Sequence, residues 1–142
     1  MKVVIGKPRT GNKFTWFIHR KFGINLMKQR VKIKMHPWDT WSADCTLSPI
    51  ITAVLKQYYG NFRNYGIPMD ETVESWDDKL SKMIHAFEDS SRECHDPTFD
   101  DIFFEEDGIT LKPNYIELSK EVYSKRKEGL LLFAEHYRSL WE

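Results

Sequence analysis

The stretch that decides the fold is Val73–Glu88, VESWDDKLSKMIHAFE. Its large apolar residues recur every three or four positions, as they do along one face of an α-helix, and charged residues occupy the other positions. The apolar residues are Val73, Trp76, Leu80, Met83, Ile84 and Phe87. Asp70, Glu71 and Glu74 lie at the amino end, where the helix dipole favours acidic groups. We therefore predict a long amphipathic helix whose apolar face lies in the core.

Two more helices are expected on either side of it. Leu47, Ile50, Ile51, Val54, Leu55 and Tyr58 fit the helical period, and Gly60 marks an end. Its start is ambiguous, because Ser48 could cap the helix with Pro49 at its first position, or Ser42 could cap an earlier start with Pro49 inside. The last predicted helix extends from about Pro113 to Leu140.

Two segments near the amino terminus have the alternation of short strands. In RVKIKMH, residues 30–36, apolar side chains alternate with Lys32, Lys34 and His36, and KVVIG, residues 2–6, is the second candidate. A short helix is expected between them, over Phe14–Phe22. The predicted fold class is therefore α+β, with three main helices packed with a small two-stranded sheet in a single globular domain, residues 1–142.

Composition limits the class of protein. The 142 residues are 41% apolar and 30% charged, which is typical of a globular chain. No apolar run approaches the roughly 18 residues of a membrane span, and the amino terminus lacks the apolar stretch of a signal peptide. Cys45 and Cys94 are too few for a disulfide framework, so a reduced, cytoplasmic protein is expected.

Charge is distributed unevenly although the net charge is zero. Residues 1–34 carry ten Lys and Arg and no acid, whereas residues 70–107 carry fourteen acids. The two regions could neutralise each other across the fold, or the basic one could form a face for a polyanion. Because nucleic-acid-binding domains are usually strongly basic, the net charge makes nucleic acid an unlikely partner.

Three segments resemble a family of uncharacterised proteins from tailed bacteriophages: WDTWSADCTLSPIITAVLKQ, WDDKLSKMIHAFE and EGLLLFAEHYRSLWE. The similarity maps onto Trp38, Asp39, Thr40, Trp41, Ser42, Asp44, Thr46 and Leu47, then Met83, Ile84, Ala86, Phe87 and Glu88, and finally Gly129, Leu130, Phe133, Leu140 and Trp141. It covers about half of the chain and implies a phage origin and a shared fold. It implies no reaction mechanism.

The segment Trp38–Asp44 is the candidate ligand-binding site. Its residues are Trp38, Asp39, Thr40, Trp41, Ser42 and Asp44. One interpretation is structural, with Asp39 or Ser42 accepting hydrogen bonds from the first helical turn and the indoles supplying core area. We expect one tryptophan in the core and the other partly exposed. The other interpretation is a pocket in which indoles stack on a ligand and free N–H groups hold an anion.

Other chemistry has weaker support. Asp39 and Asp44 could hold magnesium together with Glu74, Asp77 or Asp78 from the next helix. Zinc could use Cys94 and His95 with His85 or Cys45, but the spacing matches no standard zinc site. Motifs for phosphate-binding loops, dinucleotide binding and nucleophilic serine are absent from the sequence. No metal, cofactor or catalytic residue is predicted.

The predicted function is that of a small bacteriophage accessory protein that works in the host cytoplasm without catalysis. It would bind a host protein or a small anionic, nucleotide-like ligand, and no membrane contact is expected. Two alternatives stay open. One is a metal-dependent nucleotide hydrolase using Asp39, Asp44, Glu74 and Asp77, and the other is a nucleic-acid-binding protein using residues 2–34.

Overall fold

The computed structural model describes residues 2–5, 13–22 and 31–140. Contacts divide the chain into two compact units, Met1–Trp41 and Ser42–Glu142. That one globular domain extends over residues 1–142 stays a prediction. Among the described residues, no helix combines the length and the apolar composition needed to cross a membrane.

The described residues of the N-terminal unit, Met1–Trp41, form the short elements β1 (Lys2–Ile5), α1 (Lys13–Phe22), β2 (Val31–Lys34) and α2 (Trp38–Trp41). The two strands pair antiparallel, with Lys2 opposite Lys34 and Ile5 opposite Val31. Each strand has four residues, so the ladder is short.

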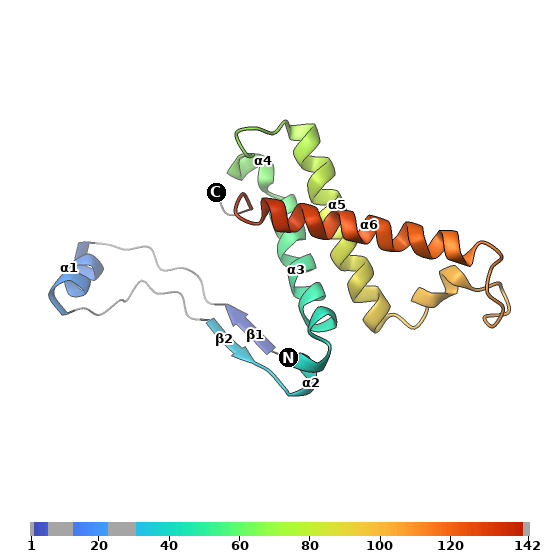
Figure 1. Ribbon diagram of the computed structural model, residues 1–142. Coiled ribbons are helices and arrows are strands. Elements are labelled where there is room, and N and C mark those ends of the chain that lie inside the picture. Colours follow the sequence, from blue (N-terminus) through green and yellow to red (C-terminus); the bar gives the residue numbers. More distant parts are fainter. Residues whose placement is uncertain (1, 6–12, 23–30, 141–142) are drawn as a thin grey trace. The chain divides into compact units, whose positions relative to one another are not determined.

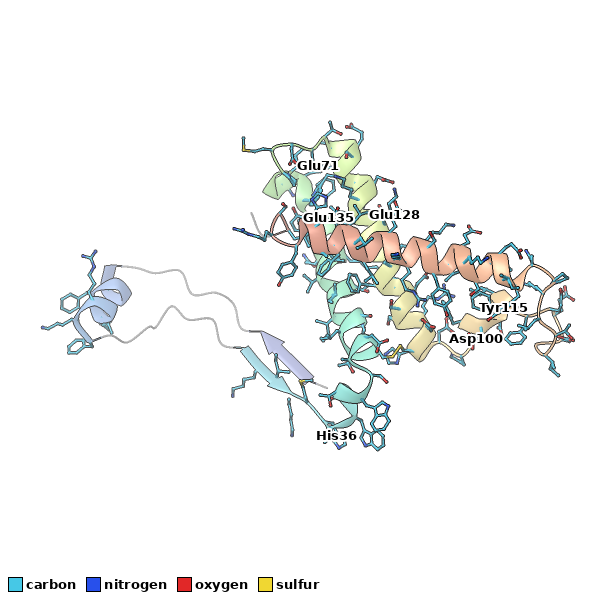
Figure 2. The ribbon with its side chains drawn as sticks, in the orientation of Figure 1. His36, Glu71, Asp100, Tyr115, Glu128 and Glu135 are labelled. Atoms are coloured by element: carbon cyan, nitrogen blue, oxygen red, sulfur yellow. A yellow bond between two sulfur atoms is a disulfide. The ribbon has the colours of Figure 1, made fainter. Side chains whose placement is uncertain are left out.

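The helical unit, Ser42–Glu142, contains α3 (Ala43–Tyr59), α4 (Phe62–Tyr65), α5 (Val73–His95), the 3₁₀ helix η1 (Phe99–Phe103) and α6 (Tyr115–His136). Within this unit α5 packs against both α3 and α6 (Figure 1). The residues before α6 are ordered by aromatic contacts, since Phe103 packs edge-on against Phe99 and Tyr115. Tyr115 and Asp100 lie at this end of α6 in Figure 2.

The core of the helical unit forms along α5. Its buried apolar side chains come from α3, α4, α5 and the chain after α6: Leu55, Phe62, Trp76, Leu80, Met83, Ile84, Phe87 and Leu140. The predicted core face from Trp76 to Phe87 is therefore confirmed, whereas Val73 is exposed. Phe87 meets Phe133 of α6 edge-on with ring centroids 4.9 Å apart, a favourable geometry for aromatic pairs.

The predicted α+β fold class is wrong, because the described chain is mostly helical. Helices of 17, 23 and 22 residues bury their apolar faces on one another, and the strands belong to the other unit. The alternation in residues 30–36 is real, but a four-residue strand offers too little apolar area to replace a neighbouring helix as the cover of a core.

The ambiguous start of the second helix is resolved in favour of the earlier position. Helix α3 begins at Ala43 with Ser42 at the N-cap position, and Pro49 lies inside it. The Ser42 carbonyl accepts a hydrogen bond from the Thr46 N–H at 3.1 Å, but the Ser42 side chain caps nothing.

Helix α5 begins with a complete set of local bonds. The Thr72 hydroxyl accepts from the Ser75 N–H at 3.1 Å, and the Ser75 hydroxyl donates to the Glu71 carboxylate at 2.7 Å. The Lys79 ammonium also binds that carboxylate. The hydrogen bond from Lys79, followed by that from Ser75, lowers the pKa of Glu71, whose side chain is almost fully buried.

Helix α6 approaches α5 closely at Gly129. A Cβ atom at this position would lie 2.3 Å from the Lys82 carbonyl oxygen and 2.6 Å from the Ala86 Cβ. Both distances are far below van der Waals contact, so only glycine lets the two helices approach this closely.

Gly129→Ala should therefore destabilise the protein, although alanine is the better helix former by about 1 kcal/mol. We expect a net loss of about 1–3 kcal/mol from overpacking, measured by urea unfolding. Gly60→Ala is the matched control. Its backbone is already helical at φ −65°, and its Cβ would make ordinary contacts at 3.6 and 3.8 Å. The control should be neutral or gain up to about 1 kcal/mol. Equal stability of the two variants would contradict the close packing.

Glu71→Gln should lower the free energy of unfolding at pH 7. A lowered pKa in the folded state means that ionised Glu71 contributes stability above its unfolded pKa of about 4.3. That contribution is lost as the pH falls through the folded pKa, so the gap between wild type and variant should close below about pH 4. Urea unfolding from pH 7 to pH 3 tests this. In a Lys79→Met background, Glu71→Gln should lower the free energy of unfolding by less than it does in the wild type. An equal loss in both backgrounds would show that Lys79 does not cause the stabilisation by Glu71.

Candidate functional site

The candidate tryptophans form a pair on the short helix α2. Trp38 and Trp41 are 73% and 83% exposed, and their ring centroids lie 6.2 Å apart with an interplanar angle of 38°. The expectation that one of them is core is wrong, because both indoles lie on the surface. Figure 2 labels His36 beside this helix.

Local hydrogen bonds hold the backbone of α2. The His36 N–H donates to the Asp39 carboxylate at 2.6 Å, and the Asp39 N–H donates to the His36 carbonyl at 2.9 Å. Only the carboxylate half of a capping box is present, because the second bond is accepted by the backbone carbonyl of His36 and not by its side chain. The bond from the His36 N–H lowers the pKa of Asp39. The Thr40 hydroxyl donates to the Pro37 carbonyl at 2.7 Å, so both polar side chains serve the turn.

The remaining candidate residues, Ser42 and Asp44, belong to the first turn of α3 in the helical unit. The Ser42 side chain makes no cap hydrogen bond, and the Asp39 carboxylate accepts from the His36 N–H, which precedes α2, rather than from a helical turn. Asp44 is exposed and lies beside two sulfur atoms: its carboxylate and the Sγ atoms of Cys45 and Cys94 lie within 4.8 Å of one another.

The acidic residues of the alternative magnesium site are not gathered within the described part of the helical unit. Among all described residues, the one group of three or more metal-ligating side chains is Asp44, Cys45 and Cys94. Asp77 pairs with Arg63 at 3.7 Å, and Asp78 pairs with Lys82 at 3.0 Å. The geometry therefore offers no support for the nucleotide hydrolase.

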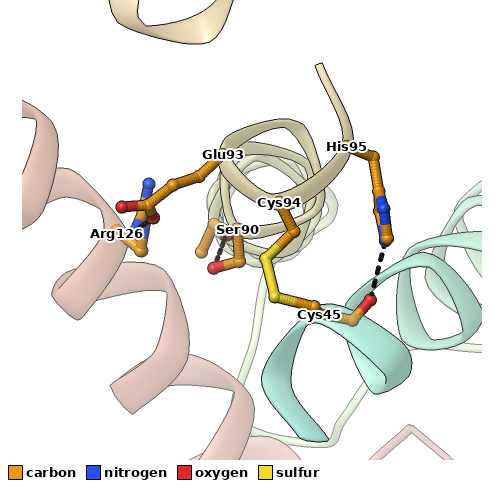
Figure 3. Close-up of a disulfide and its surroundings, with 7 residues drawn as sticks. Cys45, Ser90, Glu93, Cys94, His95 and Arg126 are labelled. Atoms are coloured by element: carbon orange, nitrogen blue, oxygen red, sulfur yellow. Dashed lines mark hydrogen bonds and ion pairs between the residues drawn. A yellow bond between two sulfur atoms is a disulfide. The ribbon is translucent and has the colours of Figure 1, made fainter. Parts of the chain in front are cut away.

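A disulfide joins Cys45 to Cys94, and the expectation of a reduced pair is wrong. It links the first turn of α3 to the last turn of α5, with Cα atoms 5.5 Å apart across 49 positions of sequence (Figure 3). His95 lies beside it, with Nε2 3.1 Å from the Cys45 carbonyl oxygen. The sequence could have predicted this pairing, since an antiparallel arrangement of the two helices places the first turn of one, with Cys45, beside the last turn of the other, with Cys94.

The N-terminal unit exposes much more apolar area than the tryptophan pair alone. Its exposed large apolar side chains are Phe14, Phe17, Phe22, Ile33, Met35, Trp38 and Trp41. Where side-chain burial is described in this unit, no residue is buried. This set is named the aromatic arm surface. Contiguous exposed apolar side chains, such as the neighbouring indoles of Trp38 and Trp41, are typical of interaction sites.

Comparisons of the chain with known protein families, with curated proteins and with solved structures found no match.

The disulfide leads to a prediction about stability. By chain entropy, closing a loop of this length is worth about 4 kcal/mol, and native disulfides commonly contribute about 2–5 kcal/mol. A thiol reductant should therefore lower the unfolding free energy of the wild type by about 2–4 kcal/mol in urea titrations. In Cys45→Ser the same reductant should change nothing. If the reductant lowered the unfolding free energy of Cys45→Ser by the same amount, its effect on the wild type would not come from breaking this disulfide.

Proposed function

We propose that this protein is a small bacteriophage accessory protein that binds a host protein, in the host cytoplasm, through the aromatic arm surface. No catalytic step is part of the proposal. The phage origin rests on the resemblance of the three sequence segments described above. The binding role rests on the exposed side chains of the N-terminal unit.

The single observation that carries the proposal is the exposure of Trp38 and Trp41. Tryptophan is enriched among the few residues that supply most of the binding energy at protein interfaces. A largely exposed indole contributes little to folding, and its burial against a partner removes a large apolar area from water. Asp39 and Thr40 hold the turn that carries both rings, so little ordering is required when a partner binds.

The charge of the same unit indicates which surface chemistry a partner should have. Residues 1–34 carry ten Lys and Arg and no acid. Positive charge in the same segment as exposed apolar side chains favours a partner with an apolar patch flanked by Asp and Glu, because complementary charges steer association and disfavour wrong partners. An acidic, partly apolar surface on a host protein has this chemistry.

A small anionic ligand fits the described geometry of α2 less well. A bound base needs a stacking face and its phosphate needs free N–H groups or cations. Here the ionised Asp39 lies between the tryptophans in sequence and repels an anion, and α2 has only four residues. The indole pair is tilted rather than parallel. These observations favour a protein partner.

The test begins with affinity capture from infected cells and continues with the purified captured protein. Trp38→Ala and Trp41→Ala should each weaken its binding by roughly 30-fold, corresponding to about 2 kcal/mol. Neither substitution should change the urea midpoint of the free protein, because both side chains are exposed. Ile109→Ala is the matched control, since Ile109 is 82% exposed but lies in the helical unit. Its affinity should equal that of the wild type.

Two results would overturn the proposal. In the first, the double tryptophan variant keeps wild-type affinity for every captured protein. In the second, the chain binds random-sequence DNA or RNA tightly near physiological ionic strength, with an affinity that falls steeply with added salt. The second result would favour the nucleic-acid-binding alternative.

A further inference from the structure

The ends of α3 and α5 that carry the disulfide also carry a carboxylate. Asp44 and Cys45 are adjacent in the first turn of α3, and Cys94 is the penultimate residue of α5. One carboxylate oxygen and the two Sγ atoms lie within 4.8 Å of one another. Two cysteine sulfurs and one carboxylate oxygen on two helices are thus close enough together to surround one ion once the disulfide is reduced.

We propose that the reduced chain binds a divalent zinc-like cation through Cys45, Cys94 and Asp44, and that the disulfide and the metal are alternative occupants of this place. Zinc accepts thiolate and carboxylate ligands together, and sites with three protein ligands leave the fourth position to water. The inference does not rest on the proposed binding function, because the cluster lies entirely within the helical unit.

The backbone positions suit both states. With Zn–S bonds of about 2.3 Å and a tetrahedral angle, two thiolates on one zinc ion lie about 3.8 Å apart. Cα atoms separated by 5.5 Å permit that separation through rotation of the cysteine side chains alone. The helices therefore need no rearrangement when a disulfide is replaced by a metal.

Charge and access also suit a cation. Reduction leaves two thiols beside a carboxylate, and a divalent ion that displaces the thiol protons balances two of the three negative charges of the resulting ligand set. Cys45 and Cys94 are half-buried and Asp44 is exposed, so an ion can enter from solvent while the thiolates keep partial protection from water. His95 is not counted as a ligand, because it does not belong to the cluster of ligand atoms that lie within 4.8 Å of one another; its Nε2 contacts the Cys45 carbonyl oxygen (Figure 3).

Reduction of the disulfide must come before metal binding. A phosphine reductant breaks the S–S bond, and the phosphine becomes a phosphine oxide whose oxygen comes from water. The two protons of that water give the two thiols. Metal binding then releases both thiol protons to solvent and forms two metal–sulfur bonds.

The experiment titrates the full chain with cobalt(II), a coloured substitute for zinc, after reduction with a phosphine. The reduced wild type should develop sulfur-to-cobalt charge-transfer absorption and the visible bands of tetrahedral cobalt, at one ion per chain. Zinc should displace the cobalt and abolish both. The oxidised chain should show neither signal, because a disulfide offers no thiolate.

Variants identify the ligands. Cys45→Ser and Cys94→Ser should abolish the charge-transfer signal of the paired thiolates or weaken affinity by at least 100-fold. Asp44→Asn should weaken zinc binding at least tenfold, since loss of an outer-shell partner alone commonly costs 10–100-fold. Asp70→Asn is the matched control, because Asp70 is an exposed acid outside the cluster, and it should bind as the wild type does. The reduced wild type is the reference for every variant, so loss of the disulfide does not confound the comparison.

A second readout remains informative if a cysteine variant fails to fold. Zinc should raise the thermal midpoint of the reduced wild type and slow the alkylation of its thiols by a maleimide, and it should do neither to the oxidised chain. Absence of a thiolate charge-transfer band in the folded, reduced chain would overturn the proposal. Zinc affinity that is equal in the reduced wild type and in Cys94→Ser would overturn it as well.

Discussion

The contact between α5 and α6 at Gly129 is the constraint on which the helical unit depends. The missing side chain lets the backbone of α6 approach the Lys82 carbonyl and Ala86, and this close approach brings Phe133 against Phe87. Helix α5 is thus covered by α6 on one side and by α3 on another, which explains why its face from Trp76 to Phe87 is so deeply buried. A larger residue at position 129 would separate the helices and open that core.

Stability and the proposed binding function are assigned to different residues. Every member of the buried cluster lies between Leu55 and Leu140, whereas no side chain whose burial is described in the N-terminal unit is buried. The short ladder of β1 and β2 is too small to bury the apolar side chains of this unit. Their exposed area is therefore available for contact with a partner. Substitutions in the aromatic arm surface can therefore separate binding from folding, which is rarely possible for core aromatics.

The two ends of the helical unit are held in different ways. At one end the chain passes from α3 through α4 towards α5, and the Cys45–Cys94 bridge lies at the opposite end. At the α4 side, local bonds and the Lys79–Glu71 ion pair order the start of α5. At the cysteine side, one covalent bond fixes the start of α3 to the end of α5. An intracellular reducing environment disfavours such a bond, so a metal held by the same sulfurs would preserve the constraint under reducing conditions.

Sequence periodicity alone determined the long helix from Val73 and its buried face from Trp76 to Phe87, because a 3.6-residue repeat is a local property. The assignment of Trp38–Asp44 as a binding segment came from its residue types and stays a prediction. Periodicity misjudged the fold class, since alternation in residues 30–36 predicts a strand without saying whether that strand covers a core. Only the tertiary structure decided that both tryptophans are exposed, that Gly129 sets the helix spacing and that Cys45 meets Cys94. Each of these depends on which residues distant in sequence become neighbours, and local pattern does not encode that information.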